Sequence, residues 1–179
     1  MSNFKVHSLD SASEGSRAAL EGTLKTIGFI PNLFSVMAES PATLEAYQHL
    51  SRLFQQTSFN AEELTVVWQT INIEHGCHYC VPAHAAIADM MKLDPALTEV
   101  LRNEKAMPTD KLQVLHDTAK LLLQKRGVLN DSELQPFYAI GYTQKHLLEL
   151  VLGVAQKVMS NYINHLADTP LDEAFTPYA

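Results

Sequence analysis

Apolar residues recur every three or four positions in nearly every long segment of this chain, between turn signals made of glycine, proline and asparagine. This spacing places apolar side chains on one face of an α-helix, whereas a half-buried strand would alternate with a period of two. No sustained period of two and no internal repeat occurs. The sequence therefore predicts an all-α fold, with a short helix that opens near residue 30 and ends before Pro41, and longer helices over about 13–27, 41–56, 60–76, 78–91, 95–102, 109–125, 131–138 and 143–166.

The segment from Thr65 to Ile73 is ambiguous, because its β-branched residues also suit a strand. Two features favour a helix. Asn60 can cap the first turn, and the acidic Glu62 and Glu63 follow it where the helix dipole favours negative charge. The apolar residues also keep helical spacing, at Leu64, Val67, Trp68 and Ile71.

Charge and hydropathy exclude two classes of partner. The 179 residues carry a net charge of −7 with no run of lysine or arginine, which argues against binding a polyanion such as nucleic acid. The most apolar stretch, 147–155, contains Glu149 and is too short to span a bilayer. The first residues lack the basic and apolar regions of a signal peptide. We therefore expect no nucleic-acid partner, no membrane association and a cytoplasmic location.

The two cysteines lie three positions apart, at Cys77 and Cys80, and His84 follows one helical turn later. On a helix these three residues share one face, and Cα atoms three apart are about 5 to 5.5 Å from each other, which a disulfide tolerates. A helix start also favours a thiolate. His84 can take the proton of Cys80, whereas the residue one turn after Cys77 is Val81. The pattern indicates a redox site in which Cys80 attacks and Cys77 resolves.

Two other interpretations of the pair stay open. A zinc site could use Cys77, Cys80 and His84 with either His75 or His78, but ligands from one short segment cannot easily surround a tetrahedral metal. The thiols could also be inert and buried. We expect neither a metal nor another cofactor.

Three stretches resemble a known family: Glu74 to His84, Gly28 to Phe34, and Asn161 to Leu171. They are similar to the AhpD-like family, the alkylhydroperoxidase and carboxymuconolactone decarboxylase superfamily, and to its peroxidase-related branch. The resemblance implies an all-α AhpD-like fold, a homo-oligomer (trimer or hexamer) and thiol-dependent reduction of a small hydroperoxide, recharged by an external dithiol reductant. It also implies that Cys80 is the attacking thiol, Cys77 its resolving partner and His84 a proton-relay residue.

This chain departs from the family pattern at two positions. Thr65 stands where the prototype has a glutamate, and Tyr79 stands where it has a histidine. The thiolate-generating relay is therefore incomplete as written, and Glu74 is a better substitute for the missing glutamate than Glu63, which is two residues out of register. Asn161 and His165 could approach the site from the last helix, although we expect them to pack between subunits.

The whole chain, 1–179, is expected to form one domain. Its predicted parts are N-terminal helices over about 13–57, a redox core over about 60–92, C-terminal helices over about 94–166, and a tail over 167–179 that lies on the domain or on a neighbouring subunit. Two alternative functions remain: a lyase of the carboxymuconolactone decarboxylase kind, which has no need for a cysteine pair, and a non-catalytic redox sensor or assembly module.

Overall fold

The computed structural model describes residues 3–179 and contains no strand in that range. The predicted all-α class is confirmed. The α-helices are α1 (Glu14–Ile27), α2 (Asn32–Met37), α3 (Pro41–Gln55), α4 (Ala61–Glu74), α5 (Cys80–Met90), α6 (Pro95–Arg102), α7 (Asp110–Gln124), α8 (Asp131–Ala139) and α9 (Gln144–Ala167), and a 3-10 helix, η1 (Glu173–Tyr178), follows them.

Local side-chain chemistry sets several of these boundaries. Asn60 and Glu63 form a capping box at the start of α4, in which each side chain accepts a hydrogen bond from the other residue's backbone N–H. Asn130 and Glu133 do the same for α8. The end of α1 is fixed by Gly28, whose φ of 91° lies in the left-handed region that glycine adopts without strain.

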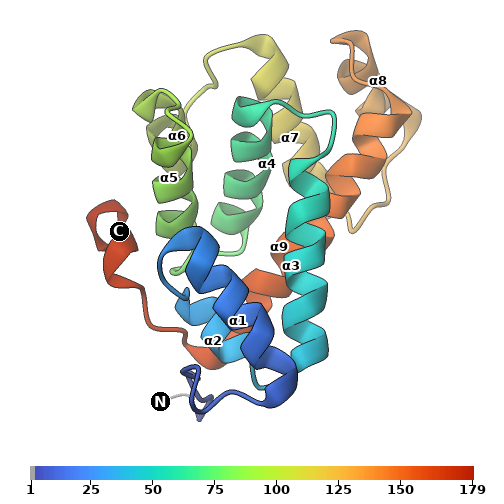
Figure 1. Ribbon diagram of the computed structural model, residues 1–179. Coiled ribbons are helices and arrows are strands. Elements are labelled where there is room, and N and C mark those ends of the chain that lie inside the picture. Colours follow the sequence, from blue (N-terminus) through green and yellow to red (C-terminus); the bar gives the residue numbers. More distant parts are fainter. Residues whose placement is uncertain (1–2) are drawn as a thin grey trace.

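Helix α4 lies at the centre of the molecule, with α5 and α6 on one side and α7 on the other, and it also packs against α9 (Figure 1). Ten of its 14 residues are buried, from Glu63 to Asn72. A helix with neighbours on several sides buries side chains round most of its surface, which explains the β-branched, strand-like composition from Thr65 to Ile73.

The apolar core has two parts. One surrounds α4 and includes Phe54, Ile71, Leu115 and Leu150. The other joins the first three helices to the start of α5 and to the tail, and it includes Leu20, Met37, Leu44, Tyr47, Phe175 and both cysteines. Figure 1 shows α1 and α2 at the end of the molecule opposite α8. The second part of the core, which contains the cysteine pair, therefore includes residues at the α1 and α2 end of the molecule.

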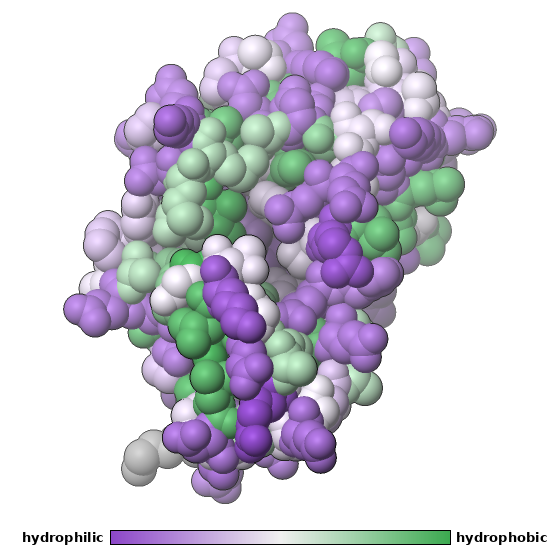
Figure 2. All heavy atoms as spheres, viewed as in Figure 1, coloured by the Kyte–Doolittle hydropathy of each residue, from purple (hydrophilic) through white to green (hydrophobic). Residues whose placement is uncertain are grey.

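The face shown in Figure 2 is mainly polar, with apolar side chains in scattered groups and a hollow near its centre. None of the helices within residues 3–179 is long and apolar enough to cross a membrane.

The tail packs on its own chain, against α5, through η1. Two hydrogen bonds hold its end there: Arg102 donates to the carbonyl of Tyr178, and the Tyr178 hydroxyl donates to Asp89 over 2.6 Å. The tail showed no period in the sequence because it is held by long-range contacts rather than by an amphipathic face.

Candidate active site around the cysteine pair

The two thiols lie where the chain turns from α4 into α5. The predicted helix from His78 begins instead at Cys80, so Cys77 lies in the preceding turn. Its carbonyl accepts from the backbone N–H of Val81 over 3.1 Å, and its Sγ lies 3.2 Å from the backbone nitrogen of Cys80. Cys77 thus satisfies N–H groups of the first turn as a capping residue does. Both cysteines are free thiols and both are buried.

A line of buried polar residues on α9 faces these thiols. Asn164 donates from Nδ2 to Cys80 Sγ over 3.2 Å, and Ser160 Oγ lies 3.9 Å from the same sulfur. One turn earlier, Lys157 donates from Nζ to His84 Nε2 over 2.8 Å. Because these three α9 residues are spaced by three and four, they share one face of the helix, and each is 0% exposed.

The surroundings make the two sulfurs chemically different. Burial by itself would raise the pKa of Cys80, but the hydrogen bond from Cys77, the charge of Lys157 and the side chains of Asn161 and Ser160 outweigh it and lower that pKa to about 5. The pKa of Cys77 is raised, because its thiol donates to Cys80 and because it is buried. At neutral pH the pair therefore holds one thiolate, on Cys80, and one thiol, on Cys77.

His84 is a neutral imidazole in this site. Burial and the positive charge of Lys157 hold its pKa well below the usual range. Its ring packs against the indole of Trp68, with ring centroids 4.9 Å apart, and the indole Nε1 is fixed by a 2.9 Å hydrogen bond to Gln156. Cys77, Cys80 and His84 thus lie in the turn before α5 and on its first turns, and His84 contacts Lys157, which the sequence interpretation missed.

No protein-family model and no curated protein matches the chain, but solved structures do. An alkylhydroperoxidase AhpD core, an uncharacterized peroxidase-related protein from Ralstonia eutropha JMP134, superimposes with a TM-score of 0.87 at 18% identity, over 97% of this chain and 94% of that chain. An uncharacterized peroxidase-related protein from Silicibacter sp. TM1040 has a TM-score of 0.83 at 17% identity, over 97% and 94% of the two chains. The chain has the AhpD-like fold.

The same fold is present in the debrominase Bmp8, whose complex with 2,3,4-tribromopyrrole superimposes with a TM-score of 0.83 at 14% identity, over 99% of this chain and 96% of that chain. The AhpD-like fold expected from the resemblance is thereby confirmed. Identities of 14% to 18% extend no further than the fold, so the chemistry rests on this chain's own residues.

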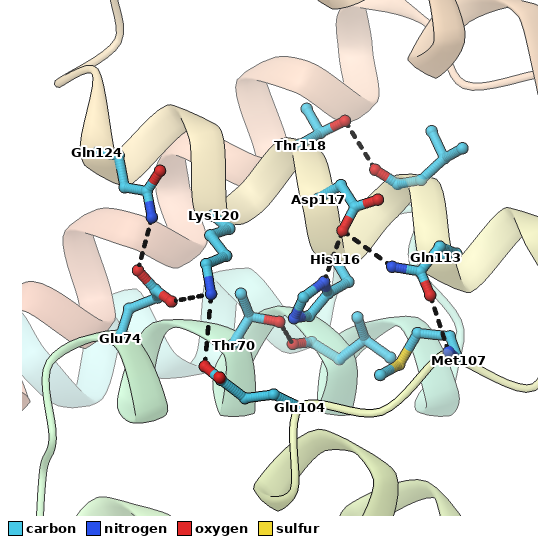
Figure 3. Close-up of polar contacts among 12 residues, drawn as sticks. Thr70, Glu74, Glu104, Met107, Gln113, His116, Asp117, Thr118, Lys120 and Gln124 are labelled. Carbon is cyan, nitrogen blue, oxygen red and sulfur yellow. Dashed lines mark hydrogen bonds and ion pairs between the residues drawn. The ribbon is translucent and has the colours of Figure 1, made fainter.

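Glu74, the expected substitute for the missing glutamate, faces α7. Its carboxylate lies 2.6 Å from Lys120 Nζ and accepts from Gln124 over 3.1 Å (Figure 3). Burial opposes ionisation of Glu74, but these two partners more than compensate and lower its pKa. Its polar contacts join the end of α4 to α7, whereas the thiols contact α9.

The other residues of the AhpD-like relay pattern have structural partners here. Thr65 donates to the carbonyl of Ala61 over 2.9 Å within α4. Glu63 is 4% exposed and is held by Lys111, Tyr142 and its capping box. None of these contacts involves a cysteine.

Tyr79 links its own stretch to the one from Gly28 to Phe34 and to Asp172, the residue that follows the third stretch. Its hydroxyl donates to Asp172 over 2.5 Å and accepts from the backbone N–H of Leu33 over 3.3 Å. Asp172 also accepts from the backbone N–H of Asn32, whose side chain donates to the carbonyl of Pro170. The residue before Cys80 therefore anchors both the start of α2 and the tail.

Asn161 lies behind the site, within the chain. Its Nδ2 donates to Asn72 Oδ1 over 3.0 Å, and its Oδ1 lies 2.8 Å from His75 Nδ1. Asn72 in turn donates to the carbonyl of Cys80 over 3.3 Å. These bonds orient the first turn of α5. Within residues 3–179, no group of three or more histidine, cysteine, aspartate or glutamate side chains is arranged to hold a metal ion.

Proposed function

We propose that this protein reduces small hydroperoxides with its cysteine pair. The observation that carries the proposal is a pair of free, buried thiols in different surroundings: Cys80 Sγ accepts from Asn164 Nδ2 over 3.2 Å, and Cys77 Sγ accepts from the backbone N–H of Cys80 over 3.2 Å. The lowered pKa of Cys80 and the raised pKa of Cys77 favour a thiolate on the first and a thiol on the second. A thiolate is the nucleophilic form of cysteine, and a neighbouring thiol is what resolves the oxidised product.

The cycle consists of three steps. The Cys80 thiolate attacks the terminal oxygen of the hydroperoxide, the O–O bond breaks, and Cys80 sulfenic acid and an alkoxide form; the alkoxide takes up a proton and leaves as the alcohol. The Cys77 thiol then attacks the Cys80 sulfur, water leaves, and a disulfide forms. An external dithiol reduces this disulfide by thiol–disulfide exchange and restores both cysteines. In this proposal His84 handles protons and Glu74 takes no part, because its carboxylate is held by Lys120 and Gln124.

A peroxide-consumption assay with a dithiol reductant tests the proposal. Wild-type protein should consume hydroperoxide over many turnovers, Cys80→Ser should consume none, and Cys77→Ser should stop after about one turnover because no internal disulfide can form. Consumption by Cys80→Ser at the wild-type rate would contradict the assignment. If no form of the protein consumes hydroperoxide, a redox sensor becomes the better account of the cysteine pair. A brominated pyrrole should be tested as an alternative oxidant in the same assay, since one AhpD-like neighbour is a debrominase.

We further propose that the protein is a homo-oligomer, a trimer or a hexamer, of the cytoplasm. Large apolar side chains lie exposed along α9, with Leu148 at 72%, Val151 at 47% and Tyr162 at 54% exposure. A second copy would cover such a face. Light scattering that gives a monomer of 19.9 kDa at micromolar concentration would contradict this.

A further inference from the structure

Three buried polar side-chain atoms of the described residues have no hydrogen-bond partner, and they lie on α5, on α9 and just after α9. Within residues 3–179 these are His84 Nδ1, Asn164 Oδ1 and Thr169 Oγ1. His84 follows Cys80 by one turn of α5, Asn164 donates to Cys80 Sγ, and the carbonyl of Thr169 bonds to His78. A buried polar atom without a partner costs about 1–3 kcal/mol and therefore needs an explanation, of which a redox or catalytic role is one.

The identity of the unpaired atoms defines what they can bind. Lys157 has donors only, so in its 2.8 Å contact His84 Nε2 is the acceptor, and the proton of the neutral imidazole lies on Nδ1. His84 therefore offers a free N–H donor. Asn164 uses its amide N–H₂ on Cys80 and offers a free carbonyl oxygen. A donor and an acceptor beside one thiolate match a hydroperoxide, which has one O–H to give and one leaving oxygen to receive a proton.

We propose that Lys157 and His84 form a proton relay that returns the Cys80 proton to the leaving oxygen of the hydroperoxide, while Asn164 Oδ1 positions the substrate through its O–H group. This inference rests on the proposed function and deepens it. Lys157 reaches the substrate through the imidazole, because its Nζ contacts His84 Nε2 over 2.8 Å.

The step balances in atoms and charge. The Cys80 thiolate attacks the terminal oxygen, the O–O bond breaks, His84 Nδ1 gives its proton to the leaving oxygen, and Lys157 gives a proton to Nε2. Thiolate, hydroperoxide and ammonium thus become sulfenic acid, alcohol and amine. When the external dithiol later reduces the disulfide, the regenerated Cys80 thiol passes its proton back to the Lys157 amine, which restores the ion pair. The relay needs no carboxylate, which fits the contacts of Glu63 with Lys111 and Tyr142 and of Glu74 with Lys120 and Gln124.

The dependence of the rate on the leaving group separates this relay from a purely electrostatic role of Lys157. Hydrogen peroxide expels hydroxide, which needs a proton, whereas peracetic acid expels acetate, which does not. Single-turnover oxidation of the reduced protein is followed with both oxidants, at a pH where ultraviolet absorbance shows the thiolate to be fully formed in every variant. Lys157→Met and His84→Gln should each slow the reaction with hydrogen peroxide by about 10²-fold, the usual size of a general-acid effect, and slow the reaction with peracetic acid far less.

Lys145→Met is the matched control, because Lys145 lies on the same helix with a side chain that is 71% exposed. It should react like the wild type with both oxidants. Circular dichroism checks that each variant folds. If Lys157→Met does not fold, His84→Gln alone tests the relay. Glutamine still offers Lys157 a hydrogen-bond acceptor but cannot pass a proton on. Equal slowing of both oxidants, or no slowing with His84→Gln, overturns the relay while leaving the peroxidase proposal intact. A wild-type protein that reacts with neither oxidant overturns both.

Discussion

At the scale of single residues, the site depends on how a buried lysine and its neighbours make two buried thiols chemically different. The hydrogen bond from Cys77 and the charge of Lys157 lower the pKa of Cys80, and burial together with the same lysine lowers the pKa of His84. Because the pKa of Cys80 is lowered to about 5, the thiolate fraction rises as pH increases through 5 and is nearly complete at neutral pH.

Ultraviolet titration of the wild-type protein should therefore show one thiolate appearing with a midpoint near pH 5. Replacing Asn164 by leucine removes the 3.2 Å hydrogen bond to Cys80 Sγ and should move the midpoint to higher pH. A wild-type midpoint at the ordinary cysteine value, about 8.5, would contradict the electrostatic account of the site.

Glu74 provides a second test at this scale. Because its carboxylate bonds to Lys120 and Gln124, the Glu74→Gln variant should leave the midpoint of Cys80 unchanged and lower the free energy of unfolding by no more than about 1 kcal/mol. Thiolate titration and urea denaturation measure the two quantities. A clear rise in the midpoint would return Glu74 to the relay.

At the scale of elements, the tail and the start of α2 are both tied to the residue before Cys80. The Tyr79→Phe variant removes the hydroxyl that donates to Asp172 and accepts from Leu33. It leaves the buried backbone N–H of Leu33 without a partner and leaves Asp172 with only the backbone N–H of Asn32. It should lower the free energy of unfolding by about 1–3 kcal/mol in urea denaturation. Tyr138→Phe is the control, at a side chain that is 38% exposed, and should change it by less than about 0.5 kcal/mol. Equal effects of the two substitutions would show that the Tyr79 contacts add nothing.

A second prediction at the scale of elements concerns the packing of α9 against α3 and α4. A Cβ at Gly153 would lie 2.7 Å from the ring of Phe54 and 3.0 Å from Val67, so Gly153→Ala should destabilise the protein by about 1–3 kcal/mol. Gly22→Ala adds a Cβ on α1 where nothing lies within 4 Å, and it should stabilise by about 0.5–1 kcal/mol. Thermal unfolding measures the stability of both variants. If Gly153→Ala leaves the stability unchanged, α9 can move away from α3 and α4 without cost.

At the scale of the whole molecule, what could be predicted from the sequence follows from the range of the interactions. Helices such as α4 and α8 could be placed because their caps and apolar spacing are local. The cysteine pair and His84 could be recognised because they are adjacent in the chain. Lys157 lies 73 residues from His84, Asn164 lies 84 from Cys80, and Asp172 lies 93 from Tyr79, so no local pattern assigns these contacts.

One signal for the missed residues was present in the last helix. Lys157, Ser160 and Asn164 recur at helical spacing within a predicted apolar helix, and polar residues on a buried face need partners. Their spacing indicated a buried polar line on α9, but the partner could be assigned only once α9 was seen to pack beside α5.

The central claim is that Cys80 and Cys77 pass two electrons to a hydroperoxide through a sulfenic acid and an internal disulfide. The most direct measurement is the intact mass of the reduced protein after one equivalent of hydrogen peroxide. We predict that the wild type loses the mass of two hydrogen atoms, that Cys77→Ser gains one oxygen atom located on Cys80, and that Cys80→Ser keeps its mass. A wild-type protein whose mass is unchanged, or an added oxygen on Cys77 in the Cys80→Ser variant, would contradict the claim.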